Sequence, residues 1–140
     1  MTSSRTLILI KPDGVRRGFV GEVLSRLERK GYSLDALRVI PPSVEALEEH
    51  YAEHAGKSFF PGVITYMSSG PIVAIVASGT GVIEGFRALA GATNPADAAP
   101  GTIRGDLALP PSGGPIENLV HGSDSAQSAE REIGIWFPGL

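Results

Sequence analysis

His121 is the residue whose type and position best suit chemistry in this sequence. It ends the apolar run Ile116–His121, and Gly122, Ser123 and Asp124 follow it directly before an expected helix. The start of a helix concentrates free backbone N–H groups, which favours the binding of an anion. An imidazole at such a place can act as a nucleophile, as a general base or only as a capping group. The residue on its own leaves these three roles open.

Two glycine-containing motifs imitate phosphate-binding loops. Residues 79–85 read GTGVIEG after an expected strand, but this GxGxxxG spacing is one residue longer than the dinucleotide-binding pattern. Gly56-Lys57-Ser58 resembles the end of a P-loop, yet Tyr51 stands where that loop needs its first glycine. We therefore expect a tight turn at 79–85 and the end of a helix at Gly56.

His50 and His54 are four residues apart, a spacing that places both on one face of a helix and occurs in metal sites. The segment reads HYAEH rather than HExxH, and the sequence offers no evident third ligand. We expect this pair to lie on an exposed helix face without a chemical role.

The elements that would position these residues follow from hydrophobic spacing and from glycine and proline. Strands are expected at Thr6–Lys11, Tyr32–Ile40, Pro71–Ala77 and Ile116–His121, and helices at Val20–Leu27, Val44–His54, Phe59–Met67, Ile83–Ala90 and Ala126–Trp136. Ser43 and Asp124 are expected helix caps, Pro12-Asp13-Gly14 is an expected turn, and residues 91–115, with ten Gly or Pro, are expected to be loop. Without the extra helices the order is βαββαβ. This predicts a mixed α/β (α+β), ferredoxin-like fold, in which helices cover one face of a four-stranded antiparallel sheet.

The amount of charge bears on assembly. With 140 residues the chain is expected to form one domain, spanning 1–140. Charged residues make up 19% of it, less than the roughly 25% usual in soluble domains. Sparse charge favours the burial of part of the surface by other subunits.

Composition also excludes several classes of function. The absence of cysteine removes disulfides, thiolate metal sites and cysteine catalysis. A net charge of -3 argues against a polyanion groove, so no nucleic-acid partner is expected. The longest aliphatic stretch, Ile72–Ala77, is far too short to cross a membrane. We expect no membrane association and a cytoplasmic location.

Long stretches of the chain resemble one enzyme family. The segment HGSDS at 121–125 is similar to the signature of nucleoside diphosphate kinases. Further matching stretches are TLILIKPDGVRRGFVGE at 6–22, EHYAEHAGKSFFPG at 49–62, YMSSGP at 66–71 and GATNPADAAPGTIRGD at 91–106. The match covers almost the whole chain and includes polar loop residues that a fold alone does not require.

The resemblance implies a function. Members of this family transfer the γ-phosphoryl group of a nucleoside triphosphate to a nucleoside diphosphate by a ping-pong mechanism, here through phospho-His121. Nucleoside tri- and diphosphates are therefore the expected partners. Two alternatives are a phosphocarrier that receives phosphate on His121 from another protein, and a non-enzymatic ferredoxin-like module. The matched nucleotide-site residues argue against both.

The resemblance also implies roles for particular residues. The implied catalytic residues are His121, Lys11, Tyr51, Glu132 and Ser123, of which Glu132 orients His121 and Ser123 is linked to Glu132. The implied substrate contacts are Lys11, Arg87, Arg104 and Thr93 to phosphates, Asn118 and Lys11 to the ribose, and Phe59 and Val63 to the base. Stacking on an aromatic ring accepts every base, since each has a π face.

Mg²⁺ is the implied cofactor. It commonly rides on phosphate oxygens with retained waters, and the sequence has no carboxylate cluster with ligand spacing. We therefore expect the substrate phosphates rather than the protein to carry the ion. Asp124 is the one acidic residue expected to reach it, through water.

One segment departs from the family pattern. Residues 107–117 read LALPPSGGPIE, a few residues more than the family usually has, and Glu117 stands where many members have a basic or polar residue. This insertion, at 110–115, leaves the matched site residues intact, and we expect a protruding, poorly packed loop at the rim of the nucleotide site. Family members commonly form tetramers or hexamers, and the sequence does not select between them.

Overall fold

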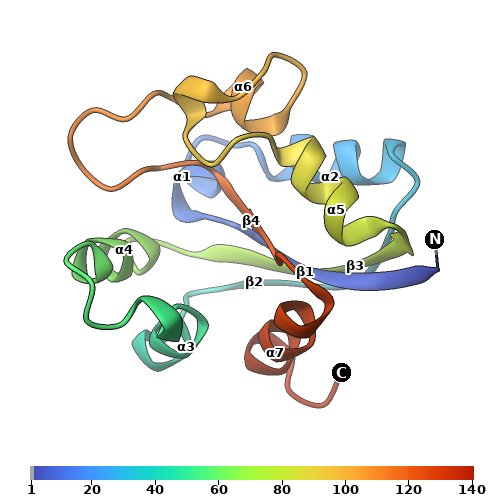
Figure 1. Ribbon diagram of the computed structural model, residues 1–140, viewed down its shortest axis with the longest axis horizontal. Helices are drawn as coiled ribbons and strands as arrows, with labels where there is room; N and C mark the ends of the chain where they lie inside the picture. The colour runs from blue at the N-terminus through green and yellow to red at the C-terminus, as the bar shows by residue number, and fades with distance from the viewer. Residues whose placement is uncertain (1) are drawn as a thin grey trace.

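The computed structural model describes residues 2–140, along which strands and helices alternate (Figure 1). The strands are β1 Ser3–Ile10, β2 Ser33–Ile40, β3 Ile72–Thr80 and β4 Val120–Gly122. The α-helices are α1 Pro12–Arg16, α2 Val20–Arg29, α3 Val44–His50, α4 Phe60–Met67, α5 Val82–Ala90, α6 Ile103–Leu107 and α7 Ala126–Trp136. Two short 3-10 helices are η1 Ala52–His54 and η2 Pro95–Asp97.

The sheet has β1 and β3 at its centre and the strand order β2-β3-β1-β4. Every neighbouring pair is antiparallel, and Leu9 of β1 pairs with Ala74 of β3 on one side and with His121 of β4 on the other. The predicted four-stranded antiparallel sheet is confirmed. It places His121 directly beside the central strand.

Helices cover both faces of the sheet, not one face as expected. Ile8 and Ile10 of β1 face a core formed with α2 and α5. Leu7 and Leu9 of the same strand face a second core formed with α3, α4 and α7. Figure 1 shows these two groups of helices on opposite sides of the sheet. A central strand that is buried on both faces is apolar at every position rather than at alternate ones.

The last strand is shorter than predicted. Extended pairing with β1 begins only at Val120, because Leu119 adopts a left-handed backbone with φ 74°. Ile116 lies in the preceding loop and is exposed. The apolar residues of this segment therefore lie partly in a loop. An apolar run alone does not distinguish a loop from a strand.

Two predicted caps have different outcomes. The Ser43 side chain accepts a hydrogen bond from the Ala46 N–H and caps α3, as expected. α7 is capped by Ser125, which accepts from the Ser128 N–H, so the prediction of Asp124 as the cap was wrong. Both residues are good caps, and the backbone entering the helix selects between them.

The glycine motifs are structural. Gly81 has φ 65° and forms the turn from β3 into α5, which confirms the tight turn expected there. Gly56 has φ 87° just beyond η1. The expected helix through His54 is interrupted, since α3 ends at His50 and a separate 3-10 turn follows.

The segment predicted as loop, 91–115, contains η2 and α6. Thr102 begins α6 by accepting a hydrogen bond from the Gly105 N–H. The expected turn at Pro12-Asp13-Gly14 likewise forms the first part of α1. Residues 109–117 are exposed and protrude, as expected for the insertion (Figure 1). Within residues 2–140 no helix is long and apolar enough to span a membrane.

Candidate active site

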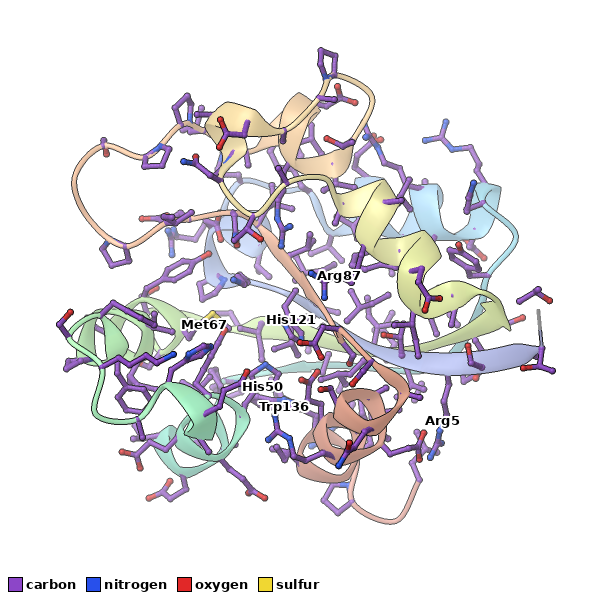
Figure 2. All side chains as sticks on the ribbon, in the orientation of Figure 1. Arg5, His50, Met67, Arg87, His121 and Trp136 are labelled. Atoms are coloured by element: carbon purple, nitrogen blue, oxygen red, sulfur yellow. The ribbon has the colours of Figure 1, made fainter. Side chains whose placement is uncertain are left out.

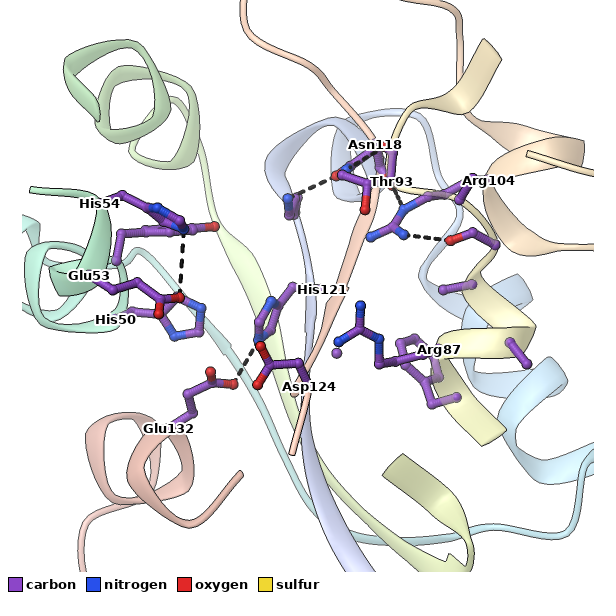
Figure 3. Close-up of a pocket in the computed structure, with 18 residues that line it drawn as sticks. His50, Glu53, His54, Arg87, Thr93, Arg104, Asn118, His121, Asp124 and Glu132 are labelled. Carbon is purple, nitrogen blue, oxygen red and sulfur yellow. Dashed lines mark hydrogen bonds and ion pairs between the residues drawn. The ribbon is translucent and has the colours of Figure 1, made fainter. Parts of the chain in front are cut away.

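A cleft of about 610 Å³ brings most of the predicted site residues together. The predicted residues that line it are Lys11, Tyr51, Arg87, Thr93, Arg104, Asn118, His121, Asp124 and Glu132 (Figure 3). They come from the ends of β1 and α3, from β4 and the loops on either side of it, from α5, α6 and α7, and from the loop after α5. Residues separated by more than a hundred positions thus face one space.

His121 is held by one edge of its ring. Its Nε2 lies 2.8 Å from Oε1 of Glu132, and the Ser123 hydroxyl donates to the same oxygen at 2.7 Å. Ser123 is buried behind Glu132, and its hydroxyl oxygen also accepts a hydrogen bond from the backbone N–H of Leu7 on β1. An ionised carboxylate can only accept hydrogen bonds, so Nε2 carries the hydrogen and Nδ1 keeps a free lone pair. The ring is therefore oriented as a nucleophile.

The backbone around His121 is tightly constrained. A Cβ atom at Gly122 would lie 2.5 Å from the ring of Phe86, so only glycine lets α5 pack this closely on β4. The left-handed Leu119 is held by a hydrogen bond from the Lys11 N–H to its carbonyl at 2.8 Å. A strained residue persists only where its surroundings fix it. Here the constraint sets the path of the chain into His121.

Arg104 and Arg87 differ in how they are held. Arg104 is buried and donates to three backbone carbonyls, those of Gly91, Asn118 and Val120, at 2.8, 3.0 and 2.6 Å. Burial, and then the positive charge of Arg87, lowers the pKa of Arg104 to about 10. Arg87 is exposed on α5, and Figure 3 shows its guanidinium reaching towards His121.

Lys11 begins a polar chain across the cleft. Its Nζ donates to Oδ1 of Asn118 at 2.8 Å, and the Asn118 amide donates to the backbone carbonyl of Thr93 at 2.9 Å. Burial, and then the charge of Arg104, lowers the pKa of Lys11 to about 8, while Asp13 opposes this. Lys11 is thus about half charged near pH 8 and mostly charged at lower pH, and an anion bound beside it would stabilise that charge.

The Tyr51 hydroxyl is buried and has no hydrogen-bond partner within residues 2–140. Burial, and then the negative charge of Glu132, raises the pKa of Tyr51, so the phenol is protonated at neutral pH. A buried hydroxyl without a partner is costly unless a ligand satisfies it. Tyr51 lines the cleft and is therefore a donor available to a bound ligand.

A second, apolar slot of about 490 Å³ adjoins the cleft. One wall consists of Phe59, Phe60 and Val63, and the other consists of residues 114–116 of the protruding loop. Its remaining lining includes residues of the polar cleft, namely Lys11, Tyr51, His54, Thr93 and Asn118. The two spaces together fit a molecule with a flat apolar ring at one end and anionic groups at the other.

The apolar slot adds Pro115 and Ile116 to the site, which sequence reasoning did not identify. A Cβ atom at Gly62 on α4 would lie 3.6 Å from Pro115, so the loop approaches this helix closely. Glu117 accepts a hydrogen bond from Arg16 at 3.2 Å, which ties the base of the loop to α1. The apolar residues Pro115 and Ile116 next to the matched Asn118 were the available signal.

His50 is buried, contrary to the prediction of an exposed helix face. Its ring lies against that of His121 with a centroid distance of 4.5 Å, and Nδ1 accepts a hydrogen bond from the indole N–H of Trp136 at 3.0 Å. Figure 2 shows these three side chains close together. The face that α3 buries depends on α7, which is far away in the sequence.

The site residues fit a magnesium ion that is carried by a substrate. Mg²⁺ requires oxygen ligands, and the carboxylate of Glu132 is already engaged by His121 and Ser123. Asp124 lines the cleft, and a hydrogen bond from Ser128 lowers its pKa, so it is ionised. The cleft therefore offers an ionised oxygen ligand at Asp124, and phosphate groups would supply the others.

Known proteins resemble this chain in sequence and in structure. The family model described as "Nucleoside diphosphate kinase" matches residues 4–140. A nucleoside diphosphate kinase of Streptococcus uberis is 58% identical over 137 residues, which cover 97% of this chain and 95% of the relative. One of Mycobacterium tuberculosis strain CDC 1551 is 54% identical over 138 residues, or 98% of each chain. The solved structure of a halophilic nucleoside diphosphate kinase from Halobacterium salinarum in complex with CDP has a TM-score of 0.90 and 42% identity, and the match covers 98% of this chain and 89% of that one.

Proposed function

The chain belongs to the nucleoside diphosphate kinase family and is a phosphotransferase acting on nucleotides, and from this we propose that it transfers the γ-phosphoryl group in two half-reactions through phospho-His121. One observation carries the proposal: the ring of His121 presents a free Nδ1 beside the cationic cleft, because Nε2 is bound to Glu132 at 2.8 Å. The phosphocarrier alternative does not require the apolar slot or Tyr51. The proposal is tested by replacing His121 with alanine and assaying phosphoryl transfer between nucleotides.

The first half-reaction can be written on the atoms of the site. The lone pair of His121 Nδ1 attacks the γ-phosphorus, the bond to the bridging oxygen breaks, and the nucleoside diphosphate leaves with that electron pair. The Nε2–H stays bound to Glu132, whose carboxylate stabilises the positive charge that develops on the ring. In the second half-reaction an oxygen of an incoming diphosphate attacks the phosphorus, and the electron pair of the N–P bond returns to Nδ1.

The surrounding cations act on the transferred group. Its transition state is loose, and negative charge is spread over the phosphoryl oxygens. We propose that Lys11, Arg87 and Arg104 neutralise this charge, with Thr93 adding a hydroxyl and the buried Tyr51 hydroxyl a further donor. The substrate phosphates, and Asp124 through water, would hold Mg²⁺. Bound to the phosphates, the ion supplies charge neutralisation of the same kind.

We propose that the nucleobase occupies the apolar slot and that Lys11 and Asn118 contact the ribose. Phe59 is 50% exposed at the mouth of the slot and is placed to stack on a base. The related halobacterial structure is described as a complex with CDP, which supports a nucleotide as the ligand of this fold. Phe59, Phe60, Val63, Pro115 and Ile116 carry no hydrogen-bonding side chain, so the walls contact the base without reading its edges.

The loop residue Ile116 is expected to contribute to nucleotide affinity. I116A should raise KM by about three- to tenfold, because truncation removes about 1 kcal/mol of apolar contact with the base, while kcat changes little. L109A is a matched control, since Leu109 is an exposed apolar residue of the same loop outside the slot. Steady-state kinetics with purine and pyrimidine nucleotides would test this. If I116A, L109A and the wild type had the same KM, the loop would not contribute to the base site.

We further propose that copies of the chain form a homo-oligomer, either a tetramer or a hexamer. β2 pairs only with β3 among the strands of residues 2–140, so its other edge is open. Leu37 and Val39 on this strand are 43% and 63% exposed. An open, apolar edge strand readily pairs with another chain.

The assembly is tested by its mass in solution. The wild type should sediment as a tetramer or a hexamer, and V39K should lower the mass, because a lysine on an edge strand opposes pairing. A wild-type monomer at assay concentration would contradict the proposal. One kinase domain over residues 1–140, a cytoplasmic location and the lack of nucleic-acid partners stay predictions.

A further inference from the structure

Two imidazole rings contact each other beside the cleft, and the proposed function uses only one of them. The ring centroids of His50 and His121 are 4.5 Å apart, and the rings are inclined at 76°. His50 is the last residue of α3 and is 3% exposed. Histidine is costly to bury unless its nitrogens are satisfied, so its place beside the nucleophile calls for a physical reason.

Trp136 determines which nitrogen of His50 carries the hydrogen. The indole Nε1–H donates to Nδ1 of His50 at 3.0 Å. An indole N–H can only donate, so Nδ1 must be the acceptor and the hydrogen of the neutral ring is on Nε2. Protonation of Nδ1 would place two N–H groups against each other. This contact therefore stabilises one neutral tautomer of His50.

One face of α7 holds both imidazoles. Glu132 and Trp136 are four residues apart on this helix and so project from the same face. Glu132 binds Nε2 of His121, and Trp136 binds Nδ1 of His50. Arg131 ties α7 to the end of α3 by donating to the backbone carbonyl of His50 at 3.3 Å. The two rings are thereby fixed relative to each other.

The carboxylate of Glu132 lies near both rings, although only His121 is bonded to it. The ligand-type atoms of His50, His121 and Glu132 all lie within 4.8 Å of one another. A charged His50 would compete with His121 for this carboxylate, since charge-assisted hydrogen bonds are stronger than neutral ones. Burial, followed by His121 and the charges of Lys11 and Arg131, lowers the pKa of His50 well below its ordinary value. The wild-type arrangement therefore keeps His50 neutral.

We propose that His50, held as the Nε2–H tautomer by Trp136, is a positioning residue that supports the ring of His121 and leaves the Glu132 carboxylate to His121 alone. This inference rests on the proposed function, because it concerns the orientation of the nucleophile. It requires no contact between His50 and the substrate. Its consequence is a specific dependence of His121 phosphorylation on pH.

W136F tests the role of the indole N–H, because it keeps an aromatic ring in the core and removes the donor. The lost hydrogen bond is made only with unprotonated Nδ1, so its removal raises the pKa of His50. His50 then becomes charged at a higher pH and competes for Glu132. The rate of His121 phosphorylation by a nucleoside triphosphate should therefore begin to fall at a higher pH than in the wild type. Measurement between about pH 5 and about pH 8 covers the range in which histidine titrates.

Replacement of His50 itself provides a rescue experiment. H50F cannot ionise, so the double variant W136F/H50F should recover the wild-type position of the acid limb. H50A should lower the phosphorylation rate constant by about tenfold through misorientation of the nucleophile, with little change in KM, and H50F should restore most of it. F137L is the matched control, because Phe137 packs in the same core beside Trp136. It should show no displacement of the acid limb.

If W136F lowered the rate of His121 phosphorylation equally at every pH, Trp136 would have a merely structural role and the proposal would be overturned. The proposal would also be overturned if the acid limb of W136F/H50F stayed displaced from its wild-type position. If the wild type forms no phosphohistidine at any pH, the proposed function itself fails, which is a distinguishable result. Nitrogen NMR of the wild-type histidine rings gives a readout without any variant. Hydrogen on Nε2 of His50 is expected there, and hydrogen on Nδ1 would also overturn the inference.

Discussion

H121A is expected to abolish phosphoryl transfer between nucleotides while leaving the protein folded. The variant lacks the Nδ1 lone pair that faces the cleft, so neither half-reaction can proceed through the protein. The loss in kcat should be on the order of 10⁴-fold or more, as when a covalent nucleophile is removed. A coupled assay with a nucleoside triphosphate and a second diphosphate measures it. Exchange at the wild-type rate in H121A would contradict the mechanism.

The fold of H121A should persist because His121 makes few stabilising contacts. Within residues 2–140 its one side-chain hydrogen bond is to Glu132, and that carboxylate retains the Ser123 hydroxyl as a partner. We expect a stability change of about 1 kcal/mol, which thermal unfolding would detect as a small shift in Tm. A cooperative transition close to that of the wild type is the necessary control. Without it, a loss of activity would report only unfolding.

Labelling separates the kinase from the phosphocarrier alternative. The wild-type protein should acquire an acid-labile phosphoryl group from a nucleoside triphosphate alone, since the apolar slot and the cationic cleft belong to the same chain. H121A should remain unlabelled. Labelling of the wild type that requires a second protein would favour the phosphocarrier instead.

R87A and R104A are expected to share a kinetic defect and to differ in stability. Both cations line the cleft, and removal of either should lower kcat/KM by about 10²- to 10³-fold, the size typical of a lost electrostatic contact to a transition state. Only Arg104 also holds the protein together, since it donates to the carbonyls of Gly91, Asn118 and Val120. R104A should therefore lose about 2–4 kcal/mol of unfolding free energy through the buried carbonyls left unpaired.

Urea unfolding together with rapid-mixing kinetics would distinguish the two arginines. R87A should unfold within about 0.5 kcal/mol of the wild type, as exposed substitutions usually do. R104K is a useful companion to R104A, because lysine keeps the charge but lacks the planar fork that reaches three carbonyls. An R87A variant with a wild-type rate of His121 phosphorylation would make Arg87 an ordinary surface residue. Equal stability of R104A and wild type would show that the three hydrogen bonds contribute nothing.

Local physics explains which elements could be predicted. β1 and β3 are long aliphatic runs closed by turn residues, and α2 ends at Arg29, two residues before Gly31, which has φ 97°. Ser43 caps α3 from within three residues of its target. Such signals act over a few positions, and the chain carries them wherever it folds. The wrong predictions of secondary structure concern Ile116, Asp124 and the short helices at 95–107. The apolar, polar and glycine-rich segments there are compatible with several local conformations.

The candidate site, too, could be predicted only in part. Resemblance in long polar stretches identified His121 and its matched partners, and the structure brings nearly all of them to one cleft with the apolar slot beside it. His50 escaped this reasoning because its own helix pattern does not reveal which face is buried. Trp136, which binds it, lies 86 positions further along the chain. The wall formed by Pro115 and Ile116 was missed for a similar reason, since its opposite wall is on α4.

By itself, the sequence determined the central strands, most of the helices, the family and the type of chemistry, because periodicity, turn residues and long matched motifs are written in consecutive positions. Only the tertiary structure decided which nitrogen of His121 is free, that His50 lies against it, and that a protruding loop closes the apolar slot. These properties depend on contacts between residues about 10 to 86 positions apart. Such contacts form only when the sheet and its two helical layers are packed together.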